Sequence, residues 1–228
     1  MPPPPNPSTP SVPRLTGDDS HEEGGGEERN AIKPYAAIIL AAGLSSRMVE
    51  NKLLLPWTDG EPIISHVLRA YVDAAVDPII VVTGRDAEGV GDAVAAYGPT
   101  LAHNPDFATG EMLSSLKVGL RSLPEGQPAV FIQPGDMPCI TGAVIKQLAA
   151  ARAPGFNVAP LYQGQRGHPV LLDRAFWRVM LDLPADARPR DVIEGAQERL
   201  QLVKVDEKGV VLDIDSREAY ERGLGLGC

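Results

Sequence analysis

The chain of 228 residues has few cysteines, no excess of basic residues and no long apolar run. With only Cys139 and Cys228 present, we expect a reducing compartment and no structural disulfide. Acidic residues outnumber basic ones by 30 to 21, which argues against nucleic-acid binding because a phosphate backbone is recognised by a basic surface. The sequence contains neither a membrane-spanning run nor the pattern of a secretory signal. These absences predict a cytoplasmic protein that binds neither membranes nor nucleic acid.

Residues 1–33 are rich in proline, glycine and acidic side chains, and almost nothing in them can bury apolar surface. We therefore expect a disordered tail, for which a docking role is a less favoured alternative to an extension without a role. The rest of the chain has the ordinary apolar content of a protein with a sizeable core. Its length suits one α/β domain, which we place at residues 34–228.

The stretch from residue 35 to residue 57 joins an apolar run to a polar, glycine-containing loop. Residues 36–42 are typical of a buried strand in a parallel sheet. Gly43 lets a ligand come close to the backbone, and Ser45, Arg47 and Lys52 follow it, a set that suits a polyphosphate. Neither G-x-x-x-x-G-K-[ST] nor G-x-G-x-x-G is present. Taken alone, the loop slightly favours an ordinary turn with solvated cations.

Apolar periodicity along the chain predicts alternating strands and helices. This order favours a mostly parallel, doubly wound sheet with right-handed crossovers. A hairpin turn at Gly164 would reverse one strand. Ligands of such sheets bind beyond the carboxyl ends of the strands, where the Gly43 loop lies. We expect strands at 36–42, 78–82, 101–103, 129–133, 157–161, 169–172 and 201–205, and helices at 62–75, 86–97, 111–120, 141–151, 175–181 and 190–200.

Two acidic segments are candidate metal ligands. Asp136 lies in P-G-D-M-P, directly after the strand expected at 129–133, where prolines hold a partly desolvated carboxylate in place. Such a group could hold Mg²⁺ against triphosphate oxygens, although the peptide alone is equally consistent with an Asx turn. Asp213 and Asp215 alternate with apolar residues and therefore face one side of an extended segment, which could equally be a solvated face.

Two further polar segments have open roles. Ser114 and Ser115 lie near the start of a helix, where free N–H groups favour a polar or anionic ligand, but first-turn polarity alone explains them better. His168, in R-G-H-P, could be a general base, a phosphate contact or a structural histidine. From the residues alone, the structural interpretation is favoured.

Taken together, these motifs resemble the molybdenum cofactor nucleotidyltransferases. The string A-A-G-x-x-x-R-M-x-x-x-K at 41–52 is similar to the signature of enzymes that move NMP from an NTP onto a phosphate or sugar phosphate. N-K-L-L-L-P-W at 51–57 and G-x-R-G-H-P-V at 164–170 resemble the cytidylyltransferase branch. The resemblance extends over about residues 36–220 and implies a three-layer α/β/α, Rossmann-like nucleotidyltransferase domain. Val49 replaces a glycine that the family often has, so the loop is expected to follow a locally different path.

The resemblance also implies a reaction and a set of roles. The enzyme would use Mg²⁺ and transfer CMP from CTP to the terminal phosphate of molybdopterin, releasing pyrophosphate. His168 needs no catalytic role, because a phosphate nucleophile is already ionised. The resemblance assigns catalysis to Arg47 and Lys52, nucleotide binding to these two with Ala42, Gly43, Ser45 and Ser115, metal binding to Asp136 and Asp215 (which fits better than Asp213), and acceptor binding to Arg166 and His168.

Three alternatives remain open at this stage. A guanylyltransferase on the same acceptor and a cytidylyltransferase on another phosphorylated metabolite would use the same residues. A non-catalytic chaperone for the molybdenum cofactor would keep the fold and deliver the cofactor to a molybdoenzyme partner. The joint presence of Arg47, Lys52 and Asp136 argues against a protein that has lost activity.

Overall fold

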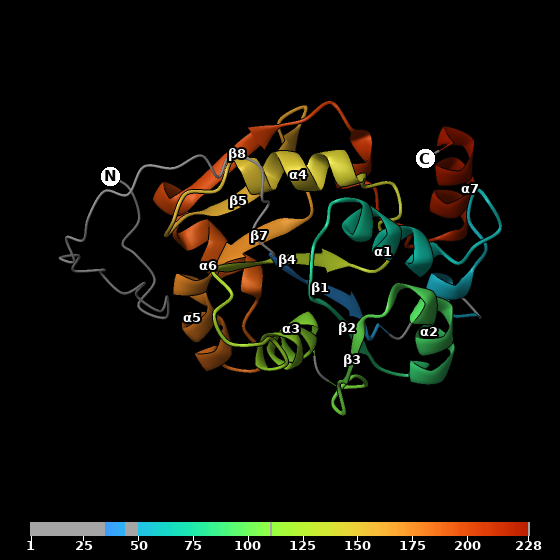
Figure 1. Ribbon diagram of the computed structural model, residues 1–228, viewed down its shortest axis with the longest axis horizontal. Coiled ribbons are helices and arrows are strands. Elements are labelled where there is room, and N and C mark those ends of the chain that lie inside the picture. Colours follow the sequence, from blue (N-terminus) through green and yellow to red (C-terminus); the bar gives the residue numbers. More distant parts are fainter. Residues whose placement is uncertain (1–34, 44–49, 110, 228) are drawn as a thin grey trace.

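A computed structural model describes residues 35–43, 50–109 and 111–227, and the expected tail at 1–33 lies outside these ranges. Within them the chain forms an eight-stranded sheet with helices on both faces (Figure 1). The strands are ordered β3-β2-β1-β4-β7-β5-β6, and β8 pairs with β5. Their bounds are β1 Ala36–Ala41, β2 Ile79–Thr83, β3 Thr100–His103, β4 Ala129–Pro134, β5 Asn157–Tyr162, β6 Gln165–Arg166, β7 Val170–Asp173 and β8 Leu200–Lys204.

The sheet is mostly parallel, as predicted. Strand β1 runs parallel to β2 and β4, β3 runs parallel to β2, and β8 runs parallel to β5. Strand β7 runs antiparallel to both β4 and β5, which it separates. The predicted reversed strand is thus confirmed, and it lies between two strands that run in the same direction.

The predicted hairpin at Gly164 is also confirmed, but its returning strand is interrupted. Leu161 pairs with Arg166 in β6, whereas Val158 pairs with Leu171 in β7. Three residues along β5 are therefore opposed by five on the returning side, so two extra residues form a bulge between β6 and β7. Bulges of this kind redirect side chains and are common beside active sites. Here the bulge contains His168.

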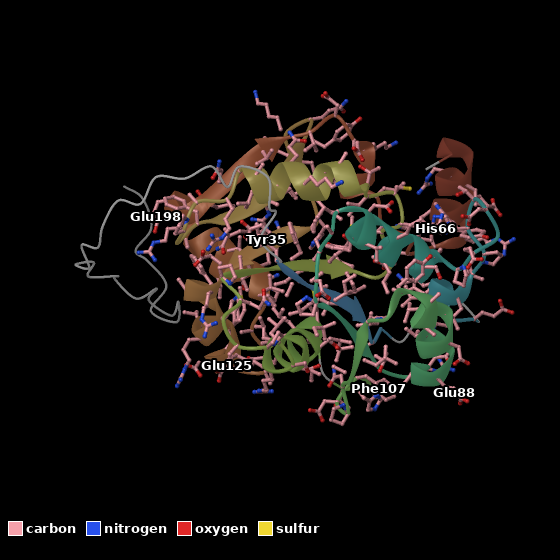
Figure 2. All side chains as sticks on the ribbon, viewed as in Figure 1. Tyr35, His66, Glu88, Phe107, Glu125 and Glu198 are labelled. Carbon is pink, nitrogen blue, oxygen red and sulfur yellow. The ribbon has the colours of Figure 1, made fainter. Side chains whose placement is uncertain are left out.

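Two apolar layers hold the helices against the sheet. Helices α1, α2 and α4 cover the face that contains Phe131, and α3, α5 and α6 cover the face that contains Ile38. Tyr35, labelled in Figure 2, meets Phe131 edge to face with ring centroids 6.1 Å apart. The helix bounds are α1 Ile63–Asp73, α2 Ala87–Val94, α3 Met112–Arg121, α4 Gly142–Ala150, α5 Trp177–Asp182, α6 Pro189–Gly195 and α7 Arg217–Leu226.

The prediction of one helix over 190–200 is wrong in its second half. Helix α6 ends at Gly195, and a 3-10 turn at Gln197–Arg199 follows. Glycine is the weakest helix former after proline, and Ala196 leaves the helical region with φ −117° and ψ 46°. The chain can then turn into β8.

The expectation of no disulfide is also wrong, because Cys139 is disulfide-bonded. The chain has one other cysteine, Cys228, which lies outside the described residues. Cys139 packs with Trp57, Ile63 and Ile214, and Tyr220 of α7 packs against this cluster. The fold thus brings its last described helix to the loop that carries Cys139, a proximity that a cysteine count does not reveal.

No helix in the described ranges is both long enough and apolar enough to cross a bilayer.

Candidate active site

The end of strand β1 is open to a ligand. Ala42 is buried and Gly43 is exposed. Among the described residues, no atom lies within 4 Å of a Cβ atom added to Gly43. The missing side chain leaves space for a ligand to approach the backbone closely. Ser45 and Arg47 of the predicted nucleotide loop, and Val49, lie in the range 44–49 outside the described residues.

Lys52 and Asp136 form an ion pair across the carboxyl ends of β1 and β4. Lys52 begins the 3-10 helix η1 at Lys52–Leu54, and the side chain of Asn51 caps this helix by accepting from the N–H of Leu53. Lys52 Nζ lies 2.5 Å from Asp136 Oδ2, and the two side chains are 18% and 17% exposed. The structure therefore joins two predicted site residues that lie 84 positions apart in the chain.

The remaining carboxylate oxygen of Asp136 suits a metal ion. Asp136 Oδ1 is buried and has no hydrogen-bond partner among the residues that the structure describes, an arrangement that costs free energy unless a ligand engages the atom. Mg²⁺ is commonly held by one or two carboxylates, with substrate phosphates and waters supplying the other ligands. Across the described ranges, no group of three or more His, Cys, Asp and Glu side chains could hold a metal by itself. The residues present therefore fit a metal that is shared with a phosphate ligand.

The second acidic segment lies beside Asp136. The backbone N–H of Ile214 donates to the carbonyl of Asp136 at 2.9 Å, and the Ile214 side chain is fully buried. Asp213 and Asp215 flank Ile214 and point to the opposite side of an extended segment. Asp213 is also close enough to His168 to raise the pKa of that imidazole. Both carboxylates that the sequence offered as the second ligand are thus brought to the Asp136 loop.

Ser115 is held by Asn104, which was not predicted as a site residue. Asn104, directly after β3, is fully buried. Its Nδ2 donates to Ser115 Oγ at 3.0 Å and to Ser114 Oγ at 2.8 Å. Ser115 is itself buried in the first turns of α3. No local pattern in the sequence indicates this bond between the strand end and the helix.

Arg166 and His168 line a cavity of about 810 Å³ on the α3–α6 side of the sheet. This volume lies within the usual range for a small-molecule site. Residues from β1, α3, β4 and β7 form its apolar floor, namely Leu40, Leu116, Ile132, Val170 and Leu172. Both predicted acceptor residues therefore face one cavity.

Two further residues, Arg190 and Glu194, complete the polar wall of this cavity. Arg190 Nε donates to Glu194 Oε1 at 2.6 Å, and Arg166 Nη2 donates to the same oxygen at 3.3 Å. The spacing of four residues between Arg190 and Glu194 predicts a surface pair on a helix. No local spacing predicts that Arg166 joins this pair, because Arg166 lies in strand β6 and the other two residues lie in helix α6.

His168 is half-buried in the cavity wall. Its backbone N–H donates to the carbonyl of Val210 at 2.8 Å, and a Cβ on Gly167 would collide with that carbonyl. Desolvation lowers the pKa of His168 from its ordinary value of 6.5, although the Ile132 carbonyl and the nearby Asp136 and Asp213 act against this. The Nδ1 atom is buried and finds no partner among the described residues. A structural role alone leaves that nitrogen unexplained.

The lowered pKa of His168 predicts a pH dependence of stability in the metal-free protein. The unfolded chain binds the proton more readily, so the stabilisation is fully present above pH 6.5 and decreases as the pH falls below that value. We expect His168→Gln to lose this part of the dependence between pH 7.5 and pH 5 in urea unfolding. The exposed His103, changed to Gln, is the control. Parallel stability curves for His168→Gln and wild type would contradict the prediction.

Comparison with known proteins identifies the family of the chain. Residues 37–204 match the MobA-like NTP transferase domain. The chain is also 30% identical over 189 residues to the molybdenum cofactor cytidylyltransferase of Escherichia coli, covering 80% of this chain and 92% of that protein. The chain belongs to the MobA-like NTP transferase family. It is accordingly a nucleotidyltransferase, and the suspected family is confirmed.

Solved structures agree on the MobA-like fold. The manganese complex of Rv0371C from Mycobacterium tuberculosis matches with a TM-score of 0.73 at 24% identity, covering 85% of this chain and 99% of that one. A nucleotidyl transferase from Methanothermobacter matches with a TM-score of 0.73 at 22% identity, covering 86% and 98%. Their strands and helices support the predicted three-layer architecture.

Proposed function

We propose that this MobA-like transferase moves CMP from CTP to the terminal phosphate of molybdopterin, with Mg²⁺ as cofactor and pyrophosphate as the second product. One observation carries the proposal: the ion pair of Lys52 with Asp136 leaves Asp136 Oδ1 buried and unpartnered. A cation and a carboxylate with a free oxygen are what a metal-bound triphosphate needs. The similarity to the Escherichia coli cytidylyltransferase supports the choice of CTP and molybdopterin.

The proposed reaction is one in-line substitution at the α-phosphorus. An oxygen of the acceptor phosphate forms a bond to the α-phosphorus of CTP, and the bond to the β-phosphate oxygen breaks, so pyrophosphate leaves with the electron pair. Lys52 stabilises the charge at the α-phosphate, and Arg47, outside the described residues, takes the β and γ oxygens. When bound, the metal ion neutralises the charge on the departing pyrophosphate.

The metal would be held by Asp136 and by one of the two acidic residues beside Ile214, Asp215 or Asp213. Asp136 Oδ2 remains with Lys52, so Oδ1 is the oxygen that we assign to the metal. Asp215 is the second ligand that the resemblance favours, with Asp213 as the alternative. The manganese complex of Rv0371C supports a divalent ion of this kind.

The cavity lined by Arg166 and His168 is the proposed acceptor site. Its apolar floor suits a flat ring system, and Arg166 adds a planar cation that matches phosphate oxygens. His168, kept neutral by burial, would form a hydrogen bond through Nδ1 rather than a charge pair. Ala42, Gly43, Ser45 and Ser115 are the proposed nucleotide contacts. The proposal also places the enzyme in the cytoplasm and has its product delivered to a molybdoenzyme.

The deciding experiment measures pyrophosphate release from each of the four NTPs with Mg²⁺, with and without molybdopterin. Release from CTP that depends on molybdopterin would establish both the reaction and the base. Release from GTP instead would support the proposed mechanism but reject CTP as the nucleotide substrate. Tight cofactor binding without release from any NTP would favour the chaperone alternative.

Arg166→Leu is expected to raise the KM for the acceptor about 10- to 100-fold and to leave the KM for CTP unchanged. The expected size corresponds to the loss of one charged hydrogen bond, about 1.5–3 kcal/mol. Arg178→Leu is the matched control, because Arg178 is 85% exposed on α5 and pairs only with its own helix neighbour Asp182. Equal KM values for Arg166→Leu and wild type would remove Arg166 from the acceptor site.

A further inference from the structure

Gln133 is a buried polar residue that neither the motifs nor the proposed reaction explains. It is fully buried near the end of β4, beside apolar neighbours in the strand A-V-F-I-Q. Because side chains alternate along a strand, it shares the α1 face of the sheet with Phe131 rather than the cavity face with Ile132. A buried amide costs free energy unless its hydrogen bonds are made. An apolar side chain would therefore be favoured at position 133 unless the hydrogen bonds of the amide have a role.

The amide of Gln133 connects helix α1 to the loop that carries Asp136. The hydroxyl of Tyr71, in α1, donates to Gln133 Oε1 at 2.7 Å. Gln133 Nε2 in turn donates to the carbonyl of Met137 at 3.2 Å. Tyr71 is fully buried, and burial raises the pKa of its phenol, so the hydroxyl stays protonated and able to donate. The chain of bonds ends on the residue directly after Asp136.

Two further bonds hold the same loop from other sides. The N–H of Gly135 donates to the carbonyl of Leu40 in β1 at 2.9 Å, and the N–H of Ile214 donates to the carbonyl of Asp136 at 2.9 Å. Positions 135, 136 and 137 are therefore each fixed by a different element. Gln133 provides the only one of these three bonds that comes from a side chain, and it can be removed by substitution.

We propose that Gln133, itself held by Tyr71, is a positioning residue that fixes the Asp136 carboxylate for the metal ion and for Lys52. Mg²⁺ requires near-ideal octahedral geometry, so a carboxylate displaced by a fraction of an ångström binds it less well. Gln133 touches neither the substrates nor the metal, and it acts through the backbone at Met137. This inference rests on the proposed function, because it needs Asp136 to be a metal ligand.

The test measures Mn²⁺ affinity in the presence of CTP and without acceptor, by electron paramagnetic resonance of free Mn²⁺. Gln133→Met keeps the side-chain volume and removes both hydrogen bonds, and we expect it to weaken Mn²⁺ binding about tenfold or more. Tyr71→Phe keeps the bond from Gln133 to Met137, so a loss of only a few-fold is expected. It is also the second variant to use if Gln133→Met does not fold.

Ser65→Ala is the matched control for a lost buried hydrogen bond. Ser65 is fully buried on the same helix α1, and its Oγ donates to the carbonyl of Ala93 in α2 at 2.9 Å, a bond that does not involve the Asp136 loop. It should lower the Tm without changing Mn²⁺ affinity.

The outcomes separate this inference from the proposed function. Wild-type Mn²⁺ affinity in both Gln133→Met and Tyr71→Phe, with lowered Tm, would overturn the positioning role alone. A wild-type protein that fails to bind Mn²⁺ with CTP would overturn the metal site, and the positioning role with it. Weakened binding in Ser65→Ala as well would make the loss a general effect of destabilisation and would also reject the inference.

Discussion

Lys52→Ala is expected to lower the rate of nucleotidyl transfer by about two to three orders of magnitude, the usual cost of removing one preorganised group that stabilises charge in a transition state. Lys52 Nζ is held 2.5 Å from Asp136 Oδ2, so the cation is positioned before the substrate arrives. Single-turnover kinetics at saturating CTP and acceptor would measure the loss directly. Most of it should appear in kcat, because the charge at the α-phosphate increases during the reaction.

The same substitution should affect catalysis far more than the fold. Lys52 lies in a short 3-10 helix whose cap, Asn51, is unchanged, but its ion pair with Asp136 is mostly buried, so we expect Lys52→Ala to lower the free energy of unfolding by about 3 kcal/mol. Lys146→Ala, on the exposed side of α4, is the control for removing a lysine from the surface. If Lys52→Ala retained more than a tenth of the wild-type rate, the assigned role would be wrong.

Asp136→Asn is expected to abolish tight metal binding and to lower turnover by a factor of about a thousand or more. The change keeps the shape of the side chain but removes the charge that a divalent cation requires. It also removes the counter-charge of Lys52 and leaves an amide atom in the place of the unpartnered oxygen, so the metal-free variant should unfold at a temperature equal to or below that of wild type. A loss of activity far larger than the loss of stability is the combination expected of a residue kept for function.

Calorimetric titration with Mn²⁺ in the presence of CTP would measure the metal affinity of Asp136→Asn. Asp92→Asn, an exposed carboxylate on α2, is the control. Metal affinity within a factor of three of wild type would reject Asp136 as a ligand. The same titration applied to Asp213→Asn and to Asp215→Asn would decide which of them is the second ligand, since the ligand's variant should lose affinity and the other should not.

The sequence predicted those parts of the fold and site that depend on local patterns. The strand ahead of Gly43 and the loop that presents Asp136 follow from apolar runs and from glycine and proline placed next to them. The helix expected from residue 141 has a local cause as well, because Thr141 Oγ accepts from the N–H of Val144 and caps α4. Each of these features depends on residues within a few positions of one another.

Features that depend on distant parts of the chain were not predicted. The contact between Lys52 and Asp136 spans 84 positions, and the bond from Tyr71 to Gln133 spans 62. No periodicity in the chain encodes such a pairing, because it depends on how strands are ordered in the sheet. The disulfide at Cys139 was missed for a similar reason, since it depends on where helix α7 packs.

The bond from Ile214 to the carbonyl of Asp136 has a consequence for truncated forms of the protein. A fragment cut after β8, at residue 204, would keep all eight strands of the described sheet. It would lack residue 214, whose N–H holds the Asp136 loop, and the acidic segment around that residue. Such a fragment would therefore retain the strands of the core while losing one of the bonds that position the proposed metal ligand.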